Sequence, residues 1–81
     1  MEITKQERVI LSSLKSEWKY IARDEDGHLY IYKVKPIKID GQYCCDMYTD
    51  YCDFSAFNHL FEFISLNDEN PHSINILINY Y

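Results

Sequence analysis

The second half of this chain lacks lysine and arginine. All eight basic residues lie between Lys5 and Lys38, whereas residues 39–81 hold seven of the thirteen acidic residues. The formal net charge of −5 therefore comes from the second half. A charge asymmetry of this kind affects the choice of partner and the rate of association, although it does not determine the fold. The shortage of basic residues also makes nucleic acid an unfavourable partner, because phosphate binding needs a basic surface.

Long apolar runs are missing as well. The first six residues are polar and lack the apolar segment of a secretory signal, and no run approaches the roughly 20 residues of a membrane helix. The three cysteines, Cys44, Cys45 and Cys52, are an odd number, and without an export signal they favour free thiols in a reducing compartment. We therefore expect a cytoplasmic protein that has no membrane partner.

The spacings of a metal or nucleophile site are absent too. Cysteine and histidine are zinc ligands, but no Cys-x2-Cys pair occurs, and the adjacent Cys44 and Cys45 would point to opposite faces of a strand. Cys52 and His59 lack the spacing that would indicate a nucleophile with an oriented base. We expect no catalytic residue, no metal and no cofactor, which favours a binding protein over an enzyme.

Two further ligand motifs are incomplete. Asp24-Glu25-Asp26-Gly27 begins like a calcium loop, but no carboxylate occurs at the expected bidentate position, near which Lys35 lies instead. A chain with two glycines has no glycine-rich phosphate loop. The acidic segment is better explained as a hairpin turn.

The residues that are abundant indicate a folded protein. Hydrophobic residues make up 47% of the chain and aromatic residues 16%, including eight tyrosines, which is far from a disordered composition. We expect residues 1–81 to form a single domain. A chain of this size buries roughly 60–65% of its unfolded surface, enough for one modest core.

The beginning of the chain predicts a helix over residues 5–16. Thr4 and Glu7 fit a capping box, in which each side chain bonds the backbone amide of the other residue. Ile10, Leu11 and Leu14 then recur at helical spacing, as does Trp18 beyond the expected end.

A small antiparallel sheet should follow. Residues 18–24 and 28–34 are rich in aromatic and β-branched residues and flank the turn Asp26-Gly27, so they predict a hairpin. Pro36 ends the second strand, because proline cannot donate to the ladder. After a second turn at Asp40-Gly41, residues 42–48 predict a third strand that completes a three-stranded meander.

The remainder predicts a loop, a second helix and a short terminal element. Residues 49–53 are expected to be a loop, and residues 55–64 a helix capped by Asp53 or Ser55. Residues 73–81 fit either a strand or a short helix. The expected class is α+β, with both long helices on one face of the sheet. Eight residues should be mostly buried: Leu14, Trp18, Ile21, Ile31, Phe57, Leu60, Phe61 and Ile64.

The residue order in two segments of the chain resembles that of a known type of domain. They are Glu17–Tyr32 with Lys35-Pro36, and Phe57–Ile64 with the Asn67–Pro71 turn and Ser73-Ile74. Together they resemble a small domain common in hypothetical proteins of phages and prophages of Gram-positive bacteria. The resemblance covers about residues 16–78 and implies a short helix for residues 74–79. It also implies an accessory protein of a mobile element, made in the bacterial cytoplasm, but it carries no functional residue.

The acidic second half is the strongest functional feature. Ordinary solubility explains it without any partner; otherwise it forms a surface for a protein with a basic face. We expect a phage or prophage accessory protein that binds a host or phage protein without catalysis. An alternative is an anti-defence inhibitor, similar to an anti-CRISPR protein, whose acidic face occupies a nucleic-acid-binding groove. The expected partner-binding face consists of Asp46, Asp50, Asp53, Glu62, Asp68 and Glu69.

A third class of function uses the expected hairpin. Its aromatic residues could stack on single-stranded nucleic acid while neighbouring cations bind phosphates. The net charge disfavours this function, and pairing of aromatic side chains across the sheet is the simpler explanation. The residues concerned are Tyr20, Tyr30 and Tyr32 with Lys19, Arg23, Lys33, Lys35 and Lys38.

The thiol chemistry gives a direct prediction. Titration of the purified, unfolded protein with a thiol reagent should find three free cysteines, and metal analysis of the native protein should find no zinc. One equivalent of zinc per chain would contradict the assignment of Cys44, Cys45 and Cys52 as free thiols.

Overall fold

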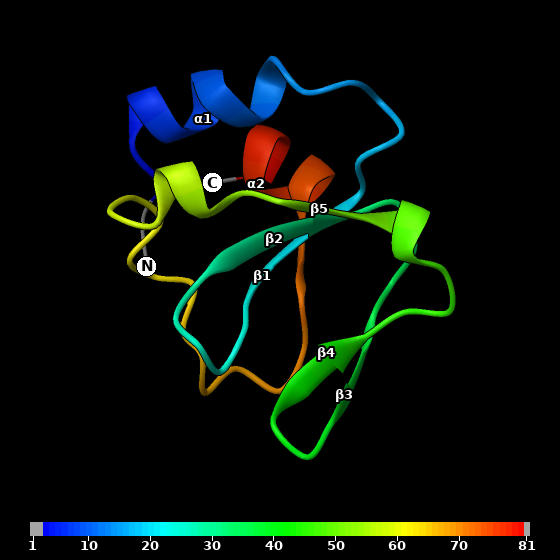
Figure 1. Cartoon of the computed structure of the whole chain (residues 1–81). Helices are drawn as coiled ribbons and strands as arrows, with labels where there is room; N and C mark the ends of the chain where they lie inside the picture. The colour runs from blue at the N-terminus through cyan, green and yellow to red at the C-terminus, as the bar shows by residue number, and fades with distance from the viewer. Residues whose placement is uncertain (1–2, 81) are drawn as a thin grey trace.

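The structure is a computed structural model that describes residues 3–80, and it has the expected α+β class (Figure 1). One antiparallel sheet has the strand order β5-β2-β1-β6, and β3 and β4 form a separate two-stranded sheet. Within residues 3–80, no helix has both the length and the apolar character needed to cross a bilayer. The elements are α1 (Lys5–Ser12), β1 (Tyr20–Arg23), β2 (Leu29–Tyr32), β3 (Ile37–Ile39), β4 (Gln42–Cys44), η1 (Tyr48–Asp50), β5 (Tyr51–Asp53), η2 (Ser55–Phe57), β6 (His72–Ser73) and α2 (Ile74–Tyr80).

Helix α1 begins as predicted and ends earlier. The capping box is confirmed: Thr4 N donates to Glu7 Oε1 at 2.9 Å, and Glu7 N donates to Thr4 Oγ1 at 3.1 Å. The helix ends at Ser12, four residues before the expected end. There the hydroxyls of Ser12 and Ser13 donate to the carbonyls four residues earlier, a bond that competes with the helical pattern.

The first hairpin is confirmed, but the three-stranded meander is wrong. Strands β1 and β2 pair from Tyr20↔Tyr32 to Arg23↔Leu29. The third strand, β4, pairs with β3 instead of β2. The turn at Asp40 and Gly41 explains this, since both residues have positive φ, 51° and 86°, as a tight two-residue hairpin requires. That turn pairs residues 37–39 locally with residues 42–44.

The segment expected to be a loop, residues 49–53, supplies the outer strand of the main sheet. Strand β5 pairs with β2 in the register Tyr30↔Asp53, Ile31↔Cys52 and Tyr32↔Tyr51. A further backbone bond, from Lys33 N to Asp50 O at 2.8 Å, extends this contact. The sheet therefore gains its third strand after the β3–β4 hairpin.

The predicted helix over residues 55–64 is also wrong. Only the 3₁₀ turn η2 forms, and Phe61 has a φ of 58°, which an α-helix does not permit. The Arg23 guanidinium donates hydrogen bonds of 2.8–3.2 Å to four carbonyls of this segment, and Glu7 Oε2 accepts from Phe61 N at 2.5 Å. Tertiary hydrogen bonds thus replace the helical ones, although the apolar spacing is helical. The carbonyls that Arg23 binds belong to Gly27, Asn58, Leu60, Phe61 and Ile64.

The C-terminal segment takes the helical alternative, and the strand alternative for residues 74–80 is wrong. His72 and Ser73 form β6, which pairs with Ile21 and Tyr20 of β1, and α2 follows at once. The short C-terminal helix is therefore confirmed. Arg8 of α1 donates to the carbonyls of Leu77 and Ile78, which joins the two helices.

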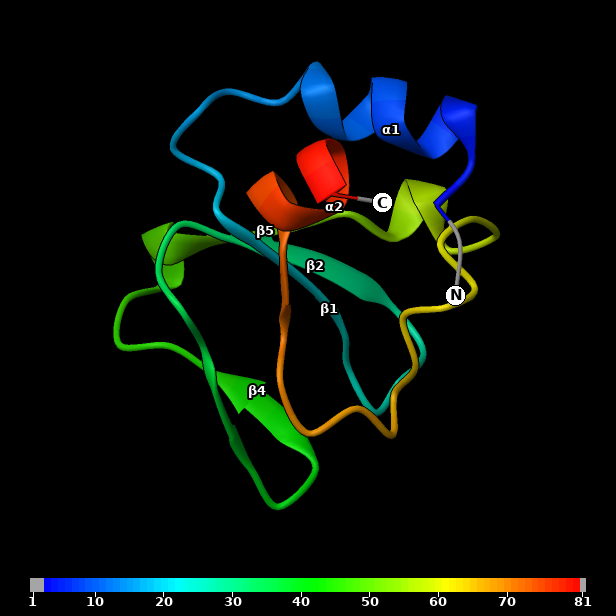
Figure 2. The same cartoon turned by 180° about the vertical axis from the view of Figure 1, so that it is seen from behind.

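The two faces of the main sheet differ. Helices α1 and α2 lie on one side and the β3–β4 hairpin lies on the other, as Figure 2 shows from behind. Four of the eight expected core residues, Ile21, Ile31, Phe61 and Ile64, are buried on the helical side. The other four are partly buried and pack against that core: Leu14, Trp18, Phe57 and Leu60.

The role of Arg23 can be tested by replacing it with lysine. An ammonium group has three donors and cannot bond five carbonyls, so Arg23→Lys should lower the free energy of unfolding by about 2–4 kcal/mol. The matched control is Lys15→Arg on the exposed surface, which should change stability little. Urea titration measures both, and equal stability of Arg23→Lys and wild type would contradict the role assigned to Arg23.

Candidate functional site

A tyrosine-rich surface lies on the side of the main sheet that the helices leave uncovered. Leu29 and Ile31 of β2 face the helical core, so the alternating Tyr30 and Tyr32 face the opposite side. Cross-strand partners share a face, which places Tyr51 and Asp53 of β5 on this side as well. The pairing register therefore creates the surface.

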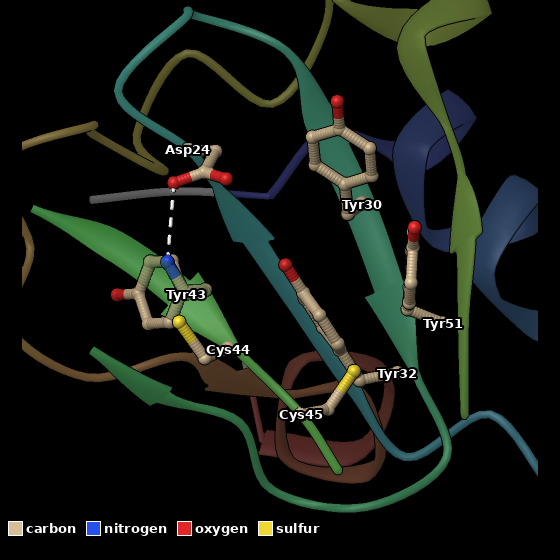
Figure 3. Close-up of a pocket in the computed structure, with 7 residues that line it drawn as sticks. All are labelled: Asp24, Tyr30, Tyr32, Tyr43, Cys44, Cys45 and Tyr51. Carbon is tan, nitrogen blue, oxygen red and sulfur yellow. Dashed lines mark hydrogen bonds between the residues drawn. The ribbon is translucent and has the colours of Figure 1, made fainter. Parts of the chain in front are cut away.

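The β3–β4 hairpin turns this surface into a pocket of about 350 Å³. Figure 3 shows Tyr30 and Tyr32 from β2, Tyr51 from β5 and Tyr43 from β4 around one space, with Asp24 at one end. Tyr32 and Tyr43 are buried, whereas Tyr51 is exposed and lies at the rim. We call this space the tyrosine pocket; its lining residues are Asp24, Tyr30, Tyr32, Tyr43, Cys44, Cys45 and Tyr51.

The four rings form a continuous aromatic wall. The ring centres of Tyr30 and Tyr51 are 6.1 Å apart, and those of Tyr32 are 6.4 Å from both Tyr51 and Tyr43. These are normal separations for tilted and edge-on aromatic pairs. Each ring is therefore packed against at least one neighbouring ring.

Two polar groups in the pocket keep free bonding capacity. The Tyr32 side chain is 3% exposed. Its hydroxyl makes no hydrogen bond with residues 3–80 and is not fully buried. In Figure 3 it points between Asp24 and Tyr30. The Oδ1 atom of Asp24 accepts from Tyr43 N at 3.2 Å and from Glu25 N at 3.0 Å. Its Oδ2 atom has no such partner among the described residues. The other two inner hydroxyls are engaged, Tyr30 with Asp26 and Tyr43 with the carbonyl of Asp68.

The local electrostatics keep three of the pocket tyrosines and the Cys45 thiol protonated. Burial, and then the charge of Asp24, raises the pKa of Tyr32 far above its usual 10.0. Burial also raises the pKa of Tyr43 and Tyr30, and nearby carboxylates add to the effect. The Cys45 thiol has a raised pKa because it is buried and lies near Asp50 and Asp46. A thiol of this kind is a poor nucleophile at neutral pH.

The six residues of the expected acidic face do not lie together on one face. Asp46 and Asp50 lie near Cys45, and Asp53 shares the tyrosine face with Tyr30, so these three carboxylates lie close to residues of the pocket lining. Asp24 and Asp26 join them, although the sequence indicated only a turn there. Five carboxylates therefore lie at or near the pocket, and Asp24 among them forms part of its lining.

The other three expected acidic residues lie apart from the mouth of the pocket. Glu62 lies near Arg23 and lines a separate hollow with Thr4 and His59. Asp68 bonds His72 at 2.9 Å and meets the tyrosine pocket only behind Tyr43. Glu69 lies in a third hollow, which Lys35 and Lys38 also line.

The cations of the hairpin are mostly engaged within the chain. Arg23 is bonded to backbone carbonyls, and Lys38 Nζ donates to the carbonyls of Leu66 and Asp68. Lys33 Nζ lies 3.7 Å from Glu17 Oε2 and 5.3 Å from the centre of the Trp18 ring. The lining of the tyrosine pocket contains no lysine or arginine.

The thiols and histidines are not gathered into one site. Cys44, Cys45 and Cys52 are free, and Cys45 is the least exposed of them. Within the described part of the chain, no three cysteine, histidine or acidic side chains are placed together to hold a metal ion.

Sequence reasoning missed the pocket because its walls come from four separate segments. The signals that were present are the two-residue spacings Tyr30-x-Tyr32 and Tyr51-x-Asp53, which alternate as strand faces do. The second was hidden in a segment expected to be a loop. Comparisons of the chain with protein-family models, curated proteins and solved structures found no match.

The raised pKa of Tyr32 gives a prediction for alkaline pH. Unfolded tyrosine loses its proton near pH 10, whereas folded Tyr32 keeps it, so the unfolded state binds fewer protons above that pH. The stability due to Tyr32 is complete below pH 10 and decreases as the pH rises above it.

Urea titrations between pH 8 and 11.5 measure this effect. The decline in unfolding free energy above pH 10 should be shallower in Tyr32→Phe than in wild type. Tyr48→Phe, at an exposed tyrosine, is the control and should decline as wild type does. Identical slopes for all three proteins would contradict the assignment of a protonated Tyr32 in the pocket.

Proposed function

We propose that this protein binds a protein partner with a basic surface, without catalysis, and that the mouth of the tyrosine pocket is the docking surface. The observation that carries the proposal is the position of five carboxylates around an aromatic pocket that has no cation in its lining. Exposed aromatic residues supply contact area at low entropic cost, and the carboxylates attract a basic partner.

The chemistry of the pocket supports binding over catalysis. Tyr30, Tyr32, Tyr43 and the Cys45 thiol have raised pKa values, which keeps them protonated and unreactive at neutral pH. An acidic mouth also disfavours nucleic acid, because phosphates would approach carboxylates. The resemblance of the sequence to phage and prophage domains supports a role in the cytoplasm of a bacterial host.

The anti-defence inhibitor is a special case of the same function. A partner whose basic groove normally holds nucleic acid would meet the same five carboxylates. The carboxylates around the pocket mouth favour this alternative, and a nucleic-acid competition assay with the captured partner would distinguish it.

The proposal is tested by changing charge at the pocket mouth. Asp46, Asp50 and Asp53 are replaced together by asparagine, and the immobilised variant is compared with wild type in capture from a bacterial lysate. The captured protein should be lost or much reduced with the variant. The captured protein should associate faster with wild type than with the variant. Its association rate with wild type should decrease as salt is raised, because the screening length falls to about 8 Å at 0.15 M.

The control carries the same change of charge elsewhere. Glu17 lies beside Lys33, and Glu62 and Glu69 line two other hollows. All three are exposed, and all three become glutamine in the control. Capture and association rate should then remain close to wild type. Equal slowing of the two variants would show that net charge alone acts, and no loss in either would contradict the proposed docking surface.

A further inference from the structure

The tyrosine pocket has the features of a receptor for a single cationic side chain. Aromatic faces attract cations, most strongly where water is partly excluded. Four tyrosine rings line the pocket, and the carboxylates near it add negative potential. The volume of about 350 Å³ accommodates one long side chain with its neighbouring backbone.

The two unbonded polar atoms define what that side chain must offer. Asp24 Oδ2 and the Tyr32 hydroxyl both have free acceptor capacity, and Figure 3 shows both groups facing the same space. The Tyr32 side chain is 3% exposed, and its hydroxyl is not among the fully buried atoms, so the hydroxyl remains accessible from the pocket. A ligand that donates from two nitrogen atoms would satisfy both acceptors.

A guanidinium group meets these requirements better than an ammonium group. It is flat, is weakly hydrated and stacks on aromatic rings, while its N–H groups donate in the plane. The ammonium group is compact and strongly hydrated, so its transfer to an aromatic pocket costs more. We propose that the tyrosine pocket binds one arginine side chain of the partner protein, stacked among the rings and bonded to Asp24 and Tyr32. This inference rests on the proposed function and specifies the chemistry of the partner.

The direct test uses small peptides in place of the partner. The probes are N-acetylated, C-amidated Gly-Arg-Gly and the same peptide with lysine or with citrulline, which has the shape of arginine without its charge. Each is titrated at low salt into protein carrying ¹³C-labelled tyrosine rings, and the ring signals are followed by NMR. The arginine peptide should shift the signals of Tyr30, Tyr32, Tyr43 and Tyr51 and leave Tyr80 unchanged, since Tyr80 lies on α2.

The affinities decide between arginine and other ligands. The arginine peptide should bind at least about fivefold more tightly than the citrulline peptide, and more tightly than the lysine peptide. Equal binding of arginine and citrulline would show that charge is not recognised. Equal binding of arginine and lysine would show an unselective acidic surface. Either result, or shifts spread over tyrosines outside the pocket, would overturn the proposal.

Two variants connect the binding to the pocket. Asp24→Asn retains an Oδ1 atom for the two backbone amides and removes the charge, so arginine binding should weaken by about tenfold. Glu62→Gln, which makes the same change of charge outside the pocket, should bind as wild type does. Equal affinity of Asp24→Asn and wild type would contradict the proposal, provided that the spectra of both show the same fold.

The peptide experiment tests the arginine pocket and the lysate experiment tests the docking surface, so each proposal can fail while the other stands. If no peptide binds but the Asp46, Asp50 and Asp53 variant still loses its captured protein, the docking surface stands and the arginine pocket is wrong. If the arginine peptide binds in the pocket but the charge variant retains its capture, the pocket stands and the docking surface is wrong.

Discussion

The fold depends on the hydrogen bonds of one side chain. Arg23 lies at the end of β1 and donates to five backbone carbonyls, one of them in the β1–β2 turn and four in residues 58–64. Burial lowers its pKa, with Glu62 acting in the opposite direction, and a guanidinium group remains charged under these conditions. Glu7 complements Arg23 by accepting the amide of Phe61, whose backbone has an unfavourable positive φ. These two side chains hold an irregular segment against the sheet where a helix would otherwise form.

The same arrangement determines what the other face of the sheet can do. The helices and residues 54–64 cover the side formed by Ile21, Leu29 and Ile31, so the core is complete there. The small β3–β4 hairpin lies on the opposite side (Figures 1 and 2). With two three-residue strands, the hairpin buries Tyr32 and Tyr43 but leaves Tyr30 half-buried and Tyr51 exposed. The tyrosine pocket is the part that remains uncovered, and this is why we assign partner binding to it.

Local signals in the sequence predicted the local structure well. The capping box of Thr4 and Glu7, the β1–β2 hairpin and the short C-terminal helix are confirmed, because each depends on residues close together in the chain. The second helix failed because Phe57, Leu60, Phe61 and Ile64 have helical spacing, while the carbonyls of the last three bond Arg23, about 40 residues earlier. The tyrosine pocket was missed for a similar reason. Asp24, Tyr43 and Tyr51 belong to different elements, and only the pairing of β5 with β2 brings the last of them to the tyrosine face.

The most direct test of this account is the backbone conformation of residues 58–64 in solution. Backbone ¹³C chemical shifts, together with the coupling constant that reports φ at Phe61, can be measured by NMR on the labelled protein. The account predicts non-helical shifts across residues 58–64 and a positive φ at Phe61, as in the structure. Continuous helical shifts from residue 55 to residue 64 would contradict it, because the carbonyls would then be bonded within a helix and Arg23 could not hold the segment that leaves the tyrosine face open.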